Sequence, residues 1–493
     1  MIEIESKGKS RRARIEGGFF VNLCVLTLSL IFLLPLLSAC SAQTPTESEP
    51  PAVESPTAEP SPSPEEQSPP PSETPDLSMD EQTNQSGDDW LFSEGNKIVD
   101  SDGNEVRLTG LNWFGYNTER LILDGSWGIS IKDTVLEIAD RGFNIIRVPL
   151  SLQLVNKWRN GEYPVYATVD SRVNPVFKEL GTLSYLDYFI EMCAEAGVKV
   201  MLDIHSVRDK IGAHNLAVWY DPSLTTEHFY LGLEYLADRY KDDDTVIALD
   251  LKNEPHGGPW GNFYAAWNDI EDENTNWAYV AKTAALRVLD INPNILIIVE
   301  GIEVYPKDVE SNSDYQSQNP DDYYYSWWGG NLRGVRDYPI DLGEHQNKLV
   351  YSPHDYGPSV GHQSWFEGEM SYERTYAEGW LDNWLFIHEE NIAPILIGEW
   401  GGPMREPTLT WKTHLRQLIC EEGLSHTYWC LNPNSGDTGG LLLDDWKTWD
   451  EEKYEFIKPT LWQKDGRFIG LDKTVPLGQS GYCRSEAAFA APN

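Results

Sequence analysis

The fold of this chain is decided by the stretch VIALDLKNEP, residues 246–255. Its apolar beginning, Val246–Leu251, is typical of a buried parallel strand, and polar residues follow where that strand ends. Glu254 then stands directly before a turn-forming proline. A carboxyl group in this position is a candidate functional group, although an ordinary surface carboxylate would have the same local sequence.

The same pattern recurs along the chain from Trp90 onward. Short apolar runs alternate with segments whose apolar residues have helical spacing, and this alternation predicts a (β/α)8 barrel. A doubly wound open sheet is the structural alternative. The predicted strands are Val106–Leu111, Asn144–Leu150, Val198–His205, Val246–Asn253, Ile295–Gly301, Lys348–Tyr356, Ala393–Gly401 and Ser425–Leu431. The predicted helices are Lys132–Arg141, Tyr185–Ala196, Thr226–Tyr240, Trp277–Leu289, Met370–Glu389 and Thr410–Glu421.

Polar or aromatic residues stand at the carboxyl ends of most predicted strands. The active sites of barrel enzymes assemble at that face from several strand ends, so this distribution favours the barrel over the open sheet. The residues are Asn112, Trp113, Arg147, His205, Asn253, Glu254, Glu300, His354, Tyr356, Glu399 and Trp429.

Two of these strand ends carry the carboxyl groups that glycoside hydrolysis needs. Glu254 and Glu399 follow the fourth and seventh predicted strands and would face each other across the barrel mouth. One carboxyl must donate a proton and the other must be ionised. His205 and His354 would also suit a metal hydrolase, but no HxxxH or HxH spacing supports metal binding. We therefore expect no metal and no cofactor.

Several motifs together resemble glycoside hydrolase family 5, in its bacterial endo-β-1,4-glucanase branch. The resemblance covers about residues 90–471 and all eight predicted strands. The motifs that carry it are GLNWFG (110–115), NIIRVP (144–149), DIH (203–205), DLKNEPH (250–256), SWWGGNL (326–332), YSPHDY (351–356), IGEW (397–400) and NPNSGDTGG (432–440).

This resemblance implies a retaining mechanism on a (β/α)8 barrel. Glu254 matches the acid/base, Glu399 the nucleophile and Asn253 the residue that holds the sugar 2-hydroxyl. Arg147 and Tyr356 match groups that hydrogen-bond the nucleophile, and His205 and His354 match active-site histidines. Trp429 matches the aromatic floor under the reacting sugar, and Trp127, Trp327 and Trp328 match platforms for flanking glucose units. The pKa of Glu399 is then expected to be lowered and that of Glu254 raised.

The expected activity is hydrolysis of internal β-1,4-glucosidic bonds, with cellulose, related β-glucans or cellooligosaccharides as substrates. The family resemblance also admits a β-mannanase or a β-1,3-glucanase. A surface lipoprotein that binds oligosaccharide without turnover is a more distant alternative, because it would not need both carboxylates.

The N-terminal part of the chain has the features of a targeting signal. A basic leader precedes the apolar run 19–37, and small residues stand before Cys40. This order predicts a lipoprotein signal peptide over residues 1–39, with Cys40 lipidated, and an uncleaved transmembrane helix is the alternative. Both place the enzyme outside the cytoplasm. Residues 40–89 are rich in Pro, Ser, Thr and Glu and predict a disordered tether. Residues 90–478 are the expected catalytic domain and 479–493 a C-terminal tail.

The composition narrows the range of partners. The net charge of −40 argues against nucleic acid, which binds through Lys and Arg, and carries no penalty for a neutral polysaccharide. Six cysteines are too few for a disulfide scaffold. Cys420 paired with Cys430, either paired with Cys483, and free thiols all stay open, as does the state of Cys193. We expect a monomer.

Overall fold

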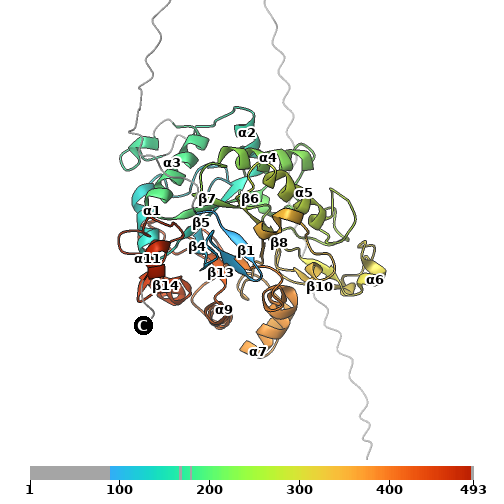
Figure 1. Ribbon diagram of the computed structural model, residues 1–493. Coiled ribbons are helices and arrows are strands. Elements are labelled where there is room, and N and C mark those ends of the chain that lie inside the picture. The colour runs from blue at the N-terminus through green and yellow to red at the C-terminus, as the bar shows by residue number, and fades with distance from the viewer. Residues whose placement is uncertain (1–88, 166–168, 178–179, 490–493) are drawn as a thin grey trace, which may run out of the picture. The chain divides into compact units, whose positions relative to one another are not determined.

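The structure, a computed structural model, describes residues 89–165, 169–177 and 180–489 (Figure 1). The predicted signal peptide, the lipidation site Cys40 and the tether as far as residue 88 lie outside the described residues. Among the described residues, no helix is both long enough and apolar enough to span a membrane.

Eight parallel strands form the central sheet, which confirms the predicted barrel (Figure 1). The sheet order is β11-β8-β7-β6-β5-β4-β13-β12, so most strands pair with their neighbours in the chain. The barrel strands are β4 (Thr109–Asn112), β5 (Ile145–Ser151), β6 (Lys199–Ser206), β7 (Val246–Asp250), β8 (Leu296–Glu300), β11 (Leu349–Ser352), β12 (Leu396–Trp400) and β13 (Ser425–Tyr428).

The seam between β11 and β12 closes the barrel less regularly than the other strand pairs. Two single parallel bridges join the strands there, Tyr351 with Ile395 and His354 with Glu399. Pro353 and Pro394 lie at this seam, and neither has a backbone N–H to donate. Three backbone hydrogen bonds of 3.1 Å cross it.

Helices surround the barrel, and they include the six that the sequence predicts. Local capping explains several boundaries: the side chains of Ser130, Ser151 and Asn276 accept hydrogen bonds at helix starts, and α9 ends at Gly423 with a φ of 66°. The helices are α1 (Ile131–Asp140), α2 (Leu152–Arg159), α3 (Thr182–Glu195), α4 (Thr226–Arg239), α5 (Trp277–Leu289), α6 (Val309–Asn312), α7 (Tyr372–Arg374), α8 (Phe386–Glu389), α9 (Thr408–Glu422), α10 (Glu451–Ile457) and α11 (Arg484–Phe489).

Shorter elements complete the chain. A π-helix, Thr375–Leu385, joins α7 to α8, so the predicted helix 370–389 is one continuous segment of changing pitch. The small strands are β1 (Phe92–Glu94), β2 (Lys97–Val99), β3 (Glu105–Val106), β9 (Val304–Pro306), β10 (Tyr323–Tyr325), β14 (Gln463–Lys464) and β15 (Arg467–Phe468). The 3-10 turns are Pro175–Phe177, Ala213–Asn215, Pro320–Asp322, Arg333–Val335, Gly343–Lys348, Ser364–Phe366 and Lys458–Thr460.

The barrel interior has an apolar layer below a polar layer. Ile145, Met201, Ala248 and Ile298 belong to one buried apolar cluster inside the barrel. Because side chains alternate along a strand, the residue two positions later points to the same side. Those residues are Arg147, Asp203, Asp250 and Glu300, and all four are fully buried. The strand pattern therefore delivers a charged layer to the carboxyl end of the barrel.

The folded unit extends beyond both predicted boundaries. Asp89, predicted as the last residue of the tether, is buried and accepts hydrogen bonds from Lys199 and Arg484. Arg484 also pairs with Asp100, and Cys483 is buried. Residues of the predicted tail thus pack against the start of the domain. The buried guanidinium of Arg484 is neutralised there by Asp89 and Asp100. All four described cysteines are free thiols.

Candidate active site

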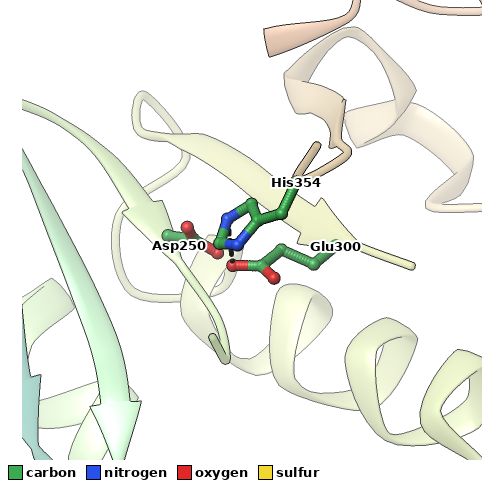
Figure 2. Close-up of side chains that lie close together, drawn as sticks. All are labelled: Asp250, Glu300 and His354. Atoms are coloured by element: carbon green, nitrogen blue, oxygen red, sulfur yellow. Dashed lines mark ion pairs between the residues drawn. The ribbon is translucent and has the colours of Figure 1, made fainter. Parts of the chain in front are cut away.

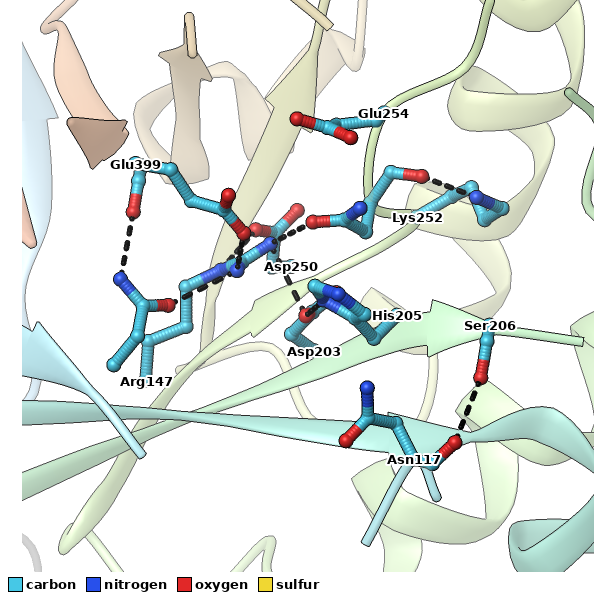
Figure 3. A network of polar contacts seen from close by, with 12 residues as sticks. Asn117, Arg147, Asp203, His205, Ser206, Asp250, Lys252, Glu254 and Glu399 are labelled. Carbon is cyan, nitrogen blue, oxygen red and sulfur yellow. Dashed lines mark hydrogen bonds and ion pairs between the residues drawn. The ribbon is translucent and has the colours of Figure 1, made fainter. Parts of the chain in front are cut away.

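The guanidinium group of Arg147, on β5, is the centre of the polar layer (Figure 3). Its Nε lies 2.8 Å from Asp250 Oδ2, and its Nη1 lies 2.8 Å from Glu399 Oε1. Its Nη2 lies 3.1 Å from both Glu300 Oε1 and Asp203 Oδ2. Burial disfavours its charge, but the four carboxylates outweigh burial and hold the pKa of Arg147 above its ordinary value.

Glu399 stands at the end of β12 and accepts two strong hydrogen bonds. Arg147 donates to its Oε1, and the hydroxyl of Tyr356 donates to its Oε2 at 2.6 Å. The residue before it has to be glycine, because a Cβ at Gly398 would lie 2.5 Å from Ser352 Oγ and 2.8 Å from His354 Nε2. Each donor binds a different carboxylate oxygen, and together they fix the orientation of the Glu399 side chain.

Glu254 follows β7 in an unusual backbone conformation, with a φ of 50°. Its backbone N–H donates to Glu300 Oε2 at 2.7 Å, which holds that conformation. Gly329 packs beside this contact so closely that a Cβ would lie 2.3 Å from Glu300 Oε2. A left-handed φ is uncommon outside glycine and concentrates at functional sites.

His354 links the two halves of the site. Its Nδ1 lies 3.0 Å from Glu254 Oε1 and 3.6 Å from Glu399 Oε2. Its Nε2 lies 3.1 Å from Glu300 Oε1, the ion pair drawn in Figure 2. Burial opposes a charge on this ring, but Glu300 and Glu399 raise the pKa of His354 well above its ordinary value. The ring therefore lies between both candidate catalytic carboxylates, which favour its charged form.

The separation of the two carboxylates is short. An oxygen of Glu254, a ring nitrogen of His354 and an oxygen of Glu399 all lie within 4.8 Å of one another. Retaining glycosidases have carboxyl groups about 5 Å apart, whereas inverting enzymes leave room for a water molecule between them. Asp250, Glu300 and His354 also have the spacing of metal ligands. Arg147 pairs with both Asp250 and Glu300, and His354 lies 3.1 Å from Glu300, so positive side chains already contact these carboxylates.

A floor of stacked rings lies beside the carboxylates. Trp429 stacks on His205 with ring centroids 5.5 Å apart and on Phe114 at 5.6 Å. The Nδ1 of His205 lies 2.8 Å from Asp203 Oδ2, so the polar layer orients this ring too. The side-chain oxygen of Asn253 accepts a hydrogen bond from Arg147 Nη2 at 3.0 Å. All these predicted site residues are thus brought together.

An open cleft of about 650 Å³ runs over this floor. Glu254, Glu399, His205, Tyr356, Trp429, Trp327 and Trp328 all line it. Trp127 is not among the lining residues. It is half-buried at 5.0 Å from Trp446, with the guanidinium of Arg120 4.4 Å above its ring. The role of Trp127 as a sugar platform stays a prediction.

The pKa values of Glu254 and Glu399 are shifted in the directions opposite to those expected from the sequence. Burial raises the pKa of Glu399 to about 7, although His354, Arg147 and Tyr356 favour its charge. Burial acts on Glu254 in the same sense, but the hydrogen bond and charge of His354 prevail and lower its pKa to about 2. The reversal arises because His354 hydrogen-bonds Glu254 rather than Glu399. Glu254 and His354 are joined by this hydrogen bond of 3.0 Å.

Three further carboxyl groups of the polar layer were not among the predicted site residues. Burial raises the pKa of Asp203 and Asp250 to about 6 and that of Glu300 to about 8. Asp203 stands two residues before His205, and Asp250 four before Glu254, so the two-residue period of a strand was the available signal. Glu300 is one of the polar strand ends in the sequence, but nothing in the sequence indicates that its side chain accepts a hydrogen bond from the backbone N–H of Glu254.

Comparisons with known proteins agree with this geometry. The family described as Cellulase (glycosyl hydrolase family 5) matches residues 99–435. Endoglucanase G of Acetivibrio thermocellus is 46% identical over 436 residues, covering 81% of this chain and 76% of that protein. Endoglucanase B of the same organism is 42% identical, covering 82% and 78%. A cellotetraose complex of the endocellulase from Pyrococcus horikoshii has a TM-score of 0.66 and 31% identity, covering 76% of this chain and 98% of that one.

Tyr356→Phe tests the control of the Glu399 charge. The substitution removes the 2.6 Å hydrogen bond to the carboxylate, so the pKa of Glu399 rises further. We expect the acidic limb of the kcat/KM profile to move upward by about one pH unit or more, because a hydrogen bond to a charged group contributes about 1.5–3 kcal/mol. Tyr351→Phe is the matched control: Tyr351 lies on β11, the strand that Tyr356 follows, and its hydroxyl accepts from the backbone N–H of Ile340. Equal profiles for both variants would contradict this role of Tyr356.

Proposed function

The chain belongs to the cellulase family, glycosyl hydrolase family 5, and on this premise we infer that it is an endo-β-1,4-glucanase. Such an enzyme hydrolyses internal β-1,4-glucosidic bonds of cellulose or related β-glucans. The observation that carries the inference is the placement of Glu254 and Glu399, with carboxylate oxygens within 4.8 Å, beneath an open aromatic cleft. This spacing supports a retaining mechanism.

In the first step, Glu399 is the proposed nucleophile. Its Oε attacks the anomeric carbon of the bound glucosyl unit, and the bond to the leaving glucan oxygen breaks. The leaving oxygen takes the proton that Glu254 and His354 hold between them. Arg147 and Tyr356 support the assignment because both donors hold Glu399 in one orientation.

In the second step, the glycosyl-enzyme is hydrolysed. Formation of the ester removes the negative charge of Glu399, and the pair of Glu254 and His354 has given up one proton, so the remaining positive charge of Arg147 favours an ionised Glu254 beside a neutral His354. Glu254 then takes a proton from water, the oxygen of that water attacks the anomeric carbon, and Glu399 departs as a carboxylate. Two displacements at one carbon restore the original β configuration.

Substrate binding follows from the cleft. We propose that Asn253 holds the 2-hydroxyl of the reacting sugar and that Trp429 stacks beneath its ring. Trp327 and Trp328 then provide platforms for the neighbouring glucosyl units of the polysaccharide or a cellooligosaccharide. Arg147, His205 and His354 shape the network beneath them. We propose that the enzyme acts as a monomer.

Mannan and β-1,3-glucan are less favoured substrates, because the endoglucanase relatives match most of this chain. A non-catalytic receptor is also disfavoured: both carboxylates are held by charge-assisted hydrogen bonds at the distance that catalysis needs. Binding alone would not require a buried histidine ring between them.

We further propose that the enzyme is a bacterial lipoprotein, anchored to a membrane through a lipid on Cys40 and facing away from the cytoplasm. The basic leader, the apolar run and the small residues before Cys40 support this proposal. The Pro-, Ser- and Thr-rich segment that follows supports a tether between anchor and catalytic domain.

Azide rescue distinguishes the roles of the two glutamates. Glu399→Gly should lower turnover of an aryl β-cellobioside by about a thousandfold or more, and azide should restore it with an α-glycosyl azide product. Glu254→Ala is the matched variant, for which azide should give the β-glycosyl azide, because Glu399 still forms the covalent intermediate. The product configuration is read by proton NMR. Wild-type turnover by Glu399→Gly, or the same azide anomer from both variants, would overturn the assignment.

A polysaccharide series tests the substrate. We expect hydrolysis of carboxymethylcellulose to exceed that of mannan and laminarin, with the viscosity falling early relative to the release of reducing ends, because internal bonds are cut. Reducing-end release and viscometry provide the measurement. Greater activity on mannan or laminarin would contradict the β-1,4-glucan assignment.

Cys40→Ser tests the anchor. The full chain expressed in a bacterium should incorporate labelled fatty acid and sediment with membranes, because lipidation requires the thiol of that cysteine. The Cys40→Ser variant should lose the label, and Cys24→Ser serves as the control that keeps it. A label retained by Cys40→Ser would refute the proposed lipidation site.

A further inference from the structure

Two exposed aromatic side chains lie together outside the cleft. Trp260, on the loop after β7, and Tyr325, on β10, are each 40% exposed. Their ring centroids are 6.0 Å apart and their planes differ by 32°. The buried ring of Tyr323 supports Trp260 from the edge at 5.5 Å. We call Trp260 and Tyr325 the aromatic ledge.

The backbone holds both rings in place. Trp260 lies against Gly258, where a Cβ would approach its Cζ2 to 2.3 Å. Tyr325 pairs with Val304 in the antiparallel hairpin of β9 and β10. Because successive side chains of a strand point to opposite faces, Tyr324 points away from the ledge, and its ring lies 4.3 Å from the guanidinium of Arg333. The ledge is thus a supported surface rather than a free loop tip.

The ledge continues the wall of the catalytic cleft. Ser326, the residue after Tyr325, lines the cleft together with Glu303 and Trp328. The backbone N–H of Gly257 donates to Glu303 Oε2 at 2.8 Å, which ties the Trp260 loop to that wall. Burial and the charge of Glu303 raise the pKa of Tyr325, in keeping with its place beside the cleft.

The same loop is joined to the aromatic rim of the cleft. His256 stacks on Trp328 with ring centroids 3.8 Å apart and an angle of 6° between the planes. His256 also contacts the backbone carbonyl of Glu254, with its Nδ1 2.6 Å from that oxygen. The loops after β7 and β8 therefore lead from Glu254 through Trp328 to the ledge. In the proposed mechanism, Glu254 protonates the leaving group, so the ledge lies on the acid/base side of the site.

We propose that Trp260 and Tyr325 form an outer glucosyl-binding subsite, which holds the leaving part of a β-1,4-glucan chain beyond the cleft. The proposal rests on the inferred endoglucanase activity. Flat aromatic rings pack on the apolar faces of glucosyl units, and a neutral polymer meets no repulsion from a chain of net charge −40. The continuity of the ledge with the cleft favours the substrate over any other occupant.

The test compares long and short substrates. Trp260→Ala and Tyr325→Ala should lower kcat/KM for cellohexaose by about three- to tenfold, as expected for the loss of one aromatic contact. Both should leave kcat/KM for an aryl β-cellobioside unchanged, because that substrate has no glucosyl unit on the leaving side. Tyr324→Ala is the matched control, since Tyr324 is 41% exposed on the same strand and faces the other way. It should leave both values unchanged.

Several results would contradict the proposal that the ledge is an outer glucosyl-binding subsite. Unchanged cellohexaose kinetics in Trp260→Ala and Tyr325→Ala would do so, as would equal losses on the two substrates. So would a wild-type dimer, seen by sedimentation, that Trp260→Ala dissociates without changing cellohexaose kinetics, because the occupant would then be a second copy of the chain. If the wild type cleaves no β-glucan, the proposed function fails separately. Retardation in gels containing carboxymethylcellulose then tests the outer subsite by binding alone. Weaker retardation of Trp260→Ala than of the wild type supports the subsite, and equal retardation rejects it.

Discussion

The buried guanidinium of Arg147 is the interaction on which the rest of the site depends. A charge without water is costly unless every part of it is paired, and here four carboxylates surround one cation. The pairing works in both directions, because those carboxylates would otherwise repel one another inside the barrel. Arg147 thereby sets the direction of the Glu399 side chain and the place of Glu300, which in turn fixes the backbone of Glu254.

Much of this arrangement was predictable because strand periodicity and barrel topology leave few choices. Arg147, His205, Glu254, His354 and Glu399 each follow or end an apolar run, and parallel strands bring such ends to one rim. The chemistry of glycoside hydrolysis then singled out the two glutamates, and the family motifs implied which of them is the acid/base and which the nucleophile. The predicted helix Trp277–Leu289 has the observed bounds, since Asn276 caps its start.

Other features depend on contacts between residues far apart in the chain. The opposite pKa shifts of Glu254 and Glu399 follow from the position of His354. Its Nδ1 lies 3.0 Å from Glu254 Oε1 but 3.6 Å from Glu399 Oε2. The inclusion of Asp89 in the fold depends on Arg484, 395 residues later. Trp127 packs against Trp446 and Arg120, and it is not among the residues that line the cleft. Neither spacing nor composition encodes such distances.

The seam between β11 and β12 gives the barrel an uneven resistance to heat. His354 and Tyr356 follow one of its strands and Glu399 lies on the other, while prolines remove hydrogen-bond donors between them. Elements with fewer backbone hydrogen bonds open at lower free energy than the rest of a domain. His354 and Glu399 therefore lie on opposite sides of a seam that we expect to open early on warming, so activity should be lost at a lower temperature than the helical content of the surrounding shell.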